Sequence, residues 1–203
     1  SDTRTYTIQV TRLSLGYSDA SLGNLGVVAH SLTTEFESSI TSYAVSTLAY
    51  DESSIRVLAA PVYAGTVMRL NGVILVPGIP SDPVSVNPGD NTVTIQVTAE
   101  DGVTTSAYTI QAFRPGNPRL SAFTSSAGAL VTPLHADTTD YNLTLVPYST
   151  TSAMVTVTAA QADATLTLNS SQPITSGVPF SVPLIAGVPT PVTIRVEAPQ
   201  LPQ

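Results

Sequence analysis

An all-β protein made of two sandwich domains is predicted by three features of the sequence. The 203 residues include 16 Pro and 12 Gly, only 10% of them are charged, and Val, Ile and Thr are abundant, as is typical of strands and turns. No stretch of ten residues has a convincing helical period. One strand-like motif also occurs twice, because Tyr6–Arg12 and Tyr108–Arg114 agree at five of seven positions.

Both copies of this motif alternate Tyr, Ile and a small apolar residue with Thr and Gln, the period-2 pattern of a half-buried strand. Its recurrence predicts a repeated domain. We expect residues 1–12 to be the closing strand of a preceding or complemented repeat, because no partner strand stands before them.

The first domain is expected to span residues 13–114. Turn residues such as Asn71-Gly72 and Asp101-Gly102 separate its short strands, and the segment Gly16–His30 is expected to be a loop. About seven short strands in about 100 residues favour an immunoglobulin-like sandwich. The strands expected after the loop lie at about 43–48, 54–60, 66–71, 83–87, 92–99 and 106–113.

Residues 115–119 are expected to be the linker, because Pro115-Gly116-Asn117-Pro118 cannot continue a strand. A second sandwich, 120–203, is then expected to lack its last strand. Its apolar residues repeat those of the first copy at an offset of 98 residues, as in Tyr43 and Tyr141, and later of 99 residues. The repeated positions predict an inward-facing core: Tyr43, Val45, Ile55, Val57, Met68, Leu70, Val93, Ile95 and Val97.

The ordered motifs of this repeat resemble those of the bacterial cadherin-like β-sandwich family. They run from a Leu-x-Leu start at Leu13 through an Asn-Gly turn and an Ala-Glu-Asp-Gly hairpin to the closing Tyr-Thr-Ile-Gln-x-x-Arg strand. The second copy departs from this pattern, with Ser170 in place of Gly72 and Pro199–Gln203 where the hairpin should begin. The resemblance implies tandem sandwiches within a large secreted or surface-attached protein, and it implies little about a ligand.

Composition excludes several classes of function. The net charge of −7 argues against nucleic acid and anionic membranes as partners. The chain has no Cys and, among its basic residues, only Arg, which excludes disulfides, thiolate metal sites and Schiff-base chemistry. No run of 18 apolar residues is present, so we expect no membrane insertion.

No catalytic residues, metal or cofactor are expected. Cadherin calcium sites collect carboxylates at the linker, whereas the segment Phe113–Arg119 contains none. His135-Ala136-Asp137 could suggest a metal or acid–base pair, but the first copy has Glu37-Ser38-Ser39 at these positions. No nucleophile elbow or phosphate-binding loop is present. We therefore expect a protein that is not an enzyme.

Ligand-binding residues, if the chain has them, are expected around the Gly16–His30 loop. Six of the eight Tyr recur between the copies (6/108, 43/141 and 50/148) and are expected to be structural, whereas two do not recur. The first copy also has nine extra residues between Leu13 and Phe36, and extra loops on a scaffold often carry function. The candidate ligand-binding residues are Tyr17, Asp19, His30 and Tyr63.

The sequence thus predicts a non-catalytic structural or adhesion module, a spacer or stalk, in an extracellular or cell-surface protein. Its expected partners are other repeats of the same protein. One alternative is a module that binds a surface glycan or protein through the Gly16–His30 loop. Another is a fibre subunit that associates head to tail by strand exchange through residues 1–12.

Overall fold

A computed structural model describes residues 3–8, 17–135 and 138–199 of the protein. Within these residues all regular secondary structure is β, which confirms the predicted fold class. The chain divides into two compact units. The first contains most of the chain up to Ala112, and the second contains Phe113–Gln203 together with the short segments Thr47–Ser53 and Val86–Asn91.

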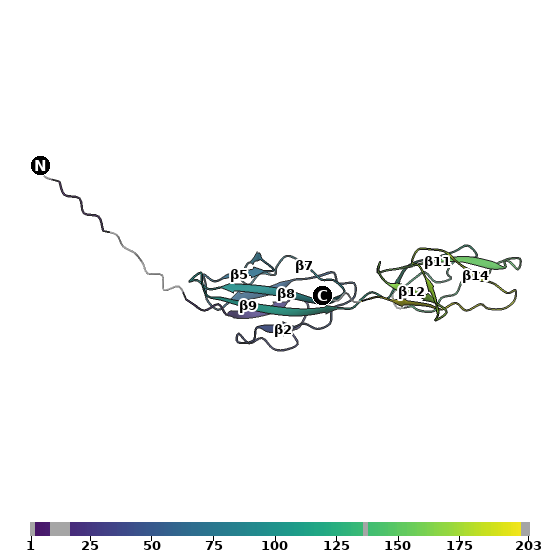
Figure 1. Cartoon of the computed structure of the whole chain (residues 1–203), viewed down its shortest axis with the longest axis horizontal. Helices are drawn as coiled ribbons and strands as arrows, with labels where there is room; N and C mark the ends of the chain where they lie inside the picture. Colours follow the sequence, from purple (N-terminus) through teal and green to yellow (C-terminus); the bar gives the residue numbers. More distant parts are fainter. Residues whose placement is uncertain (1–2, 9–16, 136–137, 200–203) are drawn as a thin grey trace. The chain divides into compact units, whose positions relative to one another are not determined.

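The first sandwich is built around a five-stranded sheet in the order β2-β9-β8-β5-β6, in which β9 lies between β2 and β8 (Figure 1). The pairs β1-β4 and β3-β7 form the remaining sheets. The strands are β1 (Leu22–Val27), β2 (Ser42–Ala44), β3 (Ser54–Ile55), β4 (Val57–Pro61), β5 (Val67–Leu70), β6 (Val73–Leu75), β7 (Val84–Ser85), β8 (Gly89–Thr98) and β9 (Thr105–Arg114).

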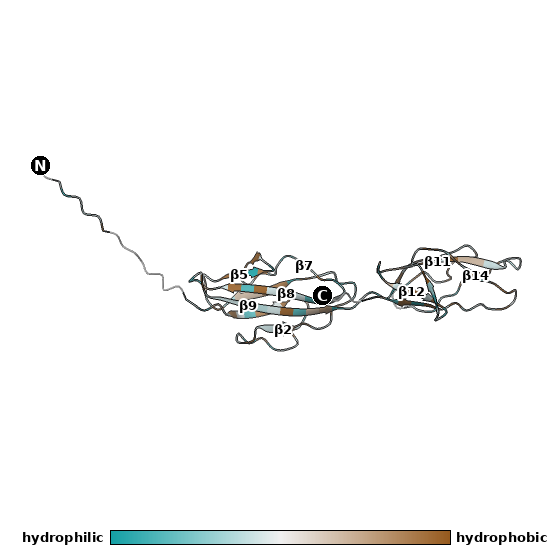
Figure 2. Cartoon of the chain, in the orientation of Figure 1, coloured by the Kyte–Doolittle hydropathy of each residue, from teal (hydrophilic) through white to brown (hydrophobic). Residues whose placement is uncertain are grey.

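Alternation along β8 and β9 explains their central place in this sheet. Hydrophobic and hydrophilic residues succeed one another along both strands (Figure 2), and every second side chain of β8 is buried, as the pleat requires. The turn at Asp101-Gly102 joins them, with the Ala99 amide donating to the Thr104 carbonyl at 2.9 Å. All nine predicted core residues are buried, which confirms the inward faces.

The prediction that Gly16–His30 is a loop is wrong, because β1 occupies Leu22–Val27. The register of β1 against β4 shifts between Leu22 and Asn24, and this bulge puts Leu22, Leu25 and Val27 on the buried side. A bulge breaks the period of two, so the strand could not be recognised by alternation. The expected domain start at Leu13 lies outside the described residues.

The second sandwich contains the sheets β10-β11-β14 and β13-β12-β15. Its strands pair in the registers of the first sandwich: Phe123 lies opposite Val157, as Leu25 lies opposite Ala59, 98 residues earlier in each case. The strands are β10 (Leu120–Ser125), β11 (Ser152–Ala159), β12 (Thr165–Leu168), β13 (Gln172–Ile174), β14 (Phe180–Pro183) and β15 (Ile194–Glu197).

This register also corrects the alignment of the two copies. Leu120 corresponds to Leu22, which pairs with Pro61 as Leu120 pairs with Ala159. The predicted insertion of nine residues between Leu13 and Phe36 is therefore wrong, because Phe36 follows Leu22 by the same number of positions as Leu134 follows Leu120. Residues 13–21 therefore precede the first described strand of the first copy and are not an insertion into it.

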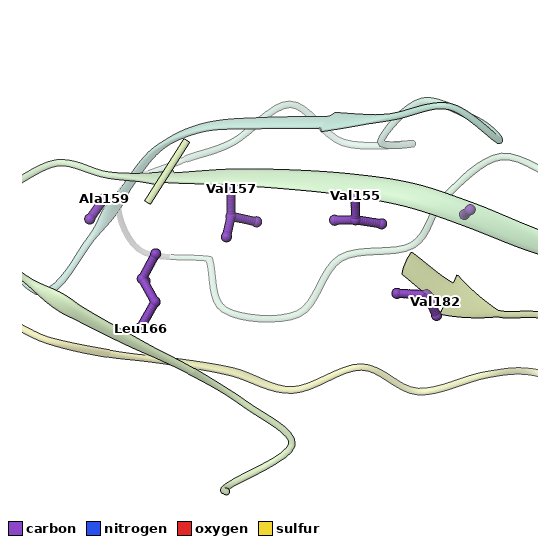
Figure 3. Close-up of a cluster of buried hydrophobic side chains, with 6 residues drawn as sticks. Val155, Val157, Ala159, Leu166 and Val182 are labelled. Carbon is purple, nitrogen blue, oxygen red and sulfur yellow. The ribbon is translucent and has the colours of Figure 1, made fainter. Parts of the chain in front are cut away.

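The core of the second sandwich lies between its two sheets. Val155, Val157 and Ala159 lie along β11, with Leu166 and Val182 in the same buried cluster (Figure 3). The side chains of β15 are only partly buried against this cluster, in contrast to those of β8. The inward side chains of β11 are thus buried, whereas those of β15 are only partly buried.

The turn after β12 differs from its counterpart after β5. Asn71-Gly72 forms a two-residue hairpin turn with both residues at positive φ, as Asn-Gly prefers. In the second sandwich three residues stand between Leu168 and its partner Gln172, and Ser170 takes φ 66°. The additional residue places β13 at an offset of 99 from β6, and the offset returns to 98 at β14, where Val182 corresponds to Val84.

The N-terminal motif is not part of a sheet in its described portion. Residues 3–8 form no strand, and the side chains of Tyr6 and Ile8 are 81% and 84% exposed. Within the described chain no sheet edge pairs with these residues, so their assignment to a preceding or complemented repeat stays a prediction. The rest of the motif, residues 9–12, lies outside the described residues.

Candidate functional site

Two of the four candidate ligand-binding residues meet in the first sandwich. The rings of Tyr17 and Tyr63 stack with centroids 4.6 Å apart and planes 10° apart. Tyr17 is 58% exposed and Tyr63 is half-buried, so the pair presents aromatic surface to solvent. Backbone pairing between Val62 and Ser21 at 3.1 Å holds the two neighbouring segments together.

Asp19 supports the entry into β1. Its Oδ1 accepts a hydrogen bond from the Ser21 amide at 2.8 Å, an Asx turn typical of such a position. Asn117 does the same for Arg119 at 3.1 Å, just before β10. The side chain at this position therefore accepts a hydrogen bond that holds the same turn in both sandwiches.

His30 is separate from the tyrosine pair. It follows the far end of β1, where it forms a bridge with Val27. Because a strand rises about 3.3 Å per residue, the length of β1 stands between His30 and the segment that carries Tyr17. The four candidates therefore do not form one site.

Only some of the six recurring tyrosines are buried or hydrogen-bonded to the backbone, as a structural role requires. The buried Tyr43 donates to the Glu37 carbonyl at 2.6 Å and accepts from the Glu37 amide at 3.0 Å, and Tyr141 makes the same two bonds with His135. Tyr108 is also buried, whereas Tyr6 and Tyr148 are exposed. The expectation that all six are buried or hydrogen-bonded at strand ends is therefore wrong for Tyr6 in the described structure.

Tyr148 differs from its counterpart in exposure. Its side chain is 88% exposed, whereas Tyr50 is half-buried. Tyr148 follows directly after Pro147 in a turn in which the Thr150 amide donates to the Pro147 carbonyl at 2.9 Å. Its ring therefore belongs to the surface, and the structural interpretation is wrong for this residue also.

The acidic residues serve turns and surface. Among the described residues, no three His, Cys, Asp or Glu side chains gather as metal ligands would. Hydrogen bonds from the Thr104 hydroxyl and from the Val103 and Thr104 amides lower the pKa of Asp101 below its ordinary value of 3.8. His135 is exposed, and its expected neighbour Asp137 lies outside the described residues.

Sequence reasoning did not identify a groove in the second sandwich. An open cavity of about 570 Å³ lies along β10 and the segment that follows it, with Phe123, Leu130 and Leu134 in its wall. In the first sandwich the Tyr108 hydroxyl accepts from the Leu22 amide at 3.1 Å, at the start of β1. Its lining residues form no motif of their own, so the sequence carried no signal for this groove.

Comparison with known families gives one match, over two segments. Residues 22–115 and 120–200 each match the Cadherin-like beta sandwich domain. A comparison with curated proteins found no match. Domains of this family are generally non-catalytic, and they are typically extracellular or surface-exposed.

The described residues include no helix long and apolar enough to cross a bilayer. The two matched segments coincide with the two sandwiches: the first begins at Leu22, where β1 begins, and the second begins at Leu120, where β10 begins. Together they cover most of the sequence. The chain therefore belongs to the cadherin-like β-sandwich domain family, whose members suggest a structural or adhesion module.

Proposed function

We propose that this chain is a spacer segment of an extracellular or cell-surface protein, with its two sandwiches as tandem structural repeats. The observation that carries this proposal is the use of recurring polar groups to hold the same turns in both sandwiches. Tyr43 and Tyr141 fix one loop, and Asn71 and Asn169 fix another. The Asn Oδ1 atoms accept from the amides of Thr94 and Thr193 at 2.9 Å and 3.0 Å.

Backbone bonds outside the strands recur in the same way. The Thr33 amide donates to the Ala44 carbonyl at 2.8 Å, and the Val131 amide donates to the Asn142 carbonyl at 2.8 Å, 98 residues later. Polar groups that form hydrogen bonds in these turns have their partners within the fold. A repeated scaffold of this kind supports a mechanical role more directly than a chemical one.

The spacer role is tested by stretching the full chain between two handles in a single-molecule experiment. We expect two separate unfolding events, because each sandwich has its own core. Unfolding the first sandwich should lengthen the chain by about 300 Å, from about 3.3–3.6 Å per extended residue less the folded length. Extension without any unfolding event would contradict the spacer role.

The stacked tyrosines favour a second candidate, a binding surface for a glycan or protein. Exposed aromatic residues are enriched at interfaces and combine an apolar face with a polar hydroxyl. Glycan arrays and protein-binding screens should compare the unchanged chain with Tyr17→Ala. Tyr148→Ala is the matched control, since it removes an exposed tyrosine of the second sandwich. Binding that only Tyr17→Ala removes would support this candidate over a passive spacer.

A further inference from the structure

We propose that the outer edge of β6 in the first sandwich pairs with the same strand of a second copy of this chain. The two strands run antiparallel about a two-fold axis, and the five-stranded sheets of the two copies join edge to edge. The proposal is independent of the spacer role, because each can hold without the other.

The outer edge of β6 is open. β6 is the last strand of the sheet β2-β9-β8-β5-β6, and within the described residues it pairs only with β5. The two-residue turn at Asn71-Gly72 makes Leu70 and Val73 the hydrogen-bonded pair that closes the hairpin. Because bonded and non-bonded pairs alternate in an antiparallel ladder, the backbone N–H and C=O of Ile74 point away from β5. Such an edge can pair with another strand.

The equivalent edge of the second sandwich lacks the donor that such pairing needs. Pro173 of β13 lies opposite Thr167, as Ile74 lies opposite Arg69. Proline has no backbone N–H, and proline on an edge strand prevents pairing with other chains. Because β13 forms with Pro173, the fold does not require an aliphatic residue at this position. The open aliphatic edge is therefore a property of the first sandwich.

Aliphatic side chains surround the edge of β6. Val73 and Ile74 are 69% and 65% exposed, and Val76 and Ile79 are each more than half exposed. In the second sandwich the exposed Gln172 stands in place of Val73. A strand added beside β6 would cover these aliphatic side chains, and their removal from water favours the pairing.

The short length of this edge fits a copy of β6 itself. The Asn71-Gly72 turn bounds the edge on one side. On the other side the chain turns after β6, where the Ile79 amide donates to the Val76 carbonyl at 3.3 Å. A longer peptide strand would extend beyond the edge at both ends. Antiparallel pairing of two copies instead places Ile74 opposite Ile74 of the second copy, joined by two backbone hydrogen bonds.

The charged side chain that lies opposite Ile74 does not prevent this pairing. Arg69 belongs to β5, and its guanidinium donates to the Gly72 carbonyl at 3.2 Å. In the paired copies three inter-strand spacings separate the two Arg69 residues, which is about 14 Å at about 4.8 Å per spacing. This separation exceeds the Debye length of about 8 Å at physiological salt, so their repulsion is largely screened.

The first test is the solution mass of the full chain, measured by sedimentation over a concentration series at physiological salt. Because β6 has only three residues, we expect monomers at low concentration and a rise towards the dimer mass at high concentration. Ile74→Lys should weaken association by roughly tenfold or more, because it places like charges opposite each other. The matched control is Leu145→Lys, which changes a fully exposed residue of the second sandwich and should associate like the unchanged chain.

A cysteine variant identifies the partner strand and its register. The chain has no Cys, so Ile74→Cys introduces a single thiol. In the proposed pairing the two Cα atoms at this position lie about 5.5 Å apart, within reach of a short bismaleimide. We expect covalent dimers in at least tenfold higher yield than from Leu145→Cys under the same conditions.

Three results would overturn the proposal. The first is equal cross-linking of Ile74→Cys and Leu145→Cys. The second is equal association of Ile74→Lys and Leu145→Lys, which would place the contact elsewhere on the molecule. The third is a full chain that stays monomeric at every concentration and gives no cross-linked dimer through Ile74→Cys.

Discussion

The two sandwiches share their strand registers but not the completeness of their cores. Ile95 and Ile194 occupy equivalent positions, each opposite a buried Leu of the neighbouring strand. Ile95 is nevertheless fully buried, while Ile194 is only partly buried. The difference follows from β9, which pairs with the other edge of β8 and has no described counterpart in the second sandwich.

The lower burial in the second sandwich extends to β10, where Leu120 and Phe123 are half-buried, but β11 keeps its buried side chains. Val155 and Val157 on β11 remain buried, as does Val57 of the first sandwich. The pairing of β10, β11 and β14 also keeps the expected offset of 98. Register in this fold is thus set locally by pairs of strands and turns, whereas burial also depends on strands further along the sheet.

The largest expected effect is a loss of core packing that differs between the sandwiches. Ile95→Ala should lower the free energy of unfolding of the first sandwich by roughly 2–5 kcal/mol, as large-to-small changes in full cores do. Ile194→Ala should cost about 1 kcal/mol, because its side chain already contacts solvent. Urea unfolding followed by circular dichroism measures both, with the exposed Glu35→Ala as control. Equal losses in the two Ile variants would refute the difference in burial.

The tyrosine hydroxyls offer a second, smaller contrast. Tyr43→Phe removes two hydrogen bonds to Glu37 from a buried ring and should cost on the order of 1–2 kcal/mol. Tyr141→Phe removes the equivalent bonds to His135, which are exposed, and should cost less than about 0.5 kcal/mol. Thermal unfolding of the two variants gives the comparison. A larger cost for Tyr141→Phe would show that its loop is better packed than the structure indicates.

The turn after β12 can be improved towards that after β5. Ser170 has φ 66°, a left-handed conformation that costs a non-glycine residue roughly 1–2 kcal/mol. Ser170→Gly should therefore stabilise the second sandwich by up to about 1 kcal/mol. Gly72→Ser, at φ 88°, should destabilise the first sandwich by a similar amount. Opposite shifts of the two urea midpoints are expected, and shifts of the same sign would contradict the assignment of backbone strain.

The smallest effect is a dependence on pH in the first sandwich. Because hydrogen bonds lower the pKa of Asp101 in the folded state, its ionised form stabilises the fold above the ordinary pKa. This contribution is lost as pH falls through the lowered pKa. Asp101→Asn should therefore show a weaker loss of stability on acidification. The urea midpoint of the first sandwich, measured as a function of pH in both proteins, tests this sign.

Much of the first sandwich could be predicted from sequence because its inward residues alternate and recur. Strand β1 could not, because the glycines at positions 23 and 26 suggested a loop and its bulge breaks the alternation. Strand β6 could not either, because it has only three residues and Val73 and Ile74 are exposed. Both strands are recognised from the strands that pair with them in the fold. A local sequence pattern carries no information about these partners.

The candidate site was predictable only in part. Tyr17 and Tyr63 were identified because they do not recur, but their stacking depends on the pairing of two distant segments. His30 was included because of the expected loop, and the strand found there separates it from the tyrosines. The groove beside β10 is formed by that strand and the segment that follows it, so it could be recognised only in the three-dimensional structure.

Amide hydrogen exchange in the full chain at low concentration tests the incomplete sheet most directly. We expect strong protection throughout β8, whose two edges are both paired, and much faster exchange in β15, whose outer edge has no neighbour among the described residues. Protection of Ile95 and Val97 should therefore exceed that of Ile194 and Val196 by far. Equal protection of the two strands under these conditions would contradict the difference in pairing between β8 and β15.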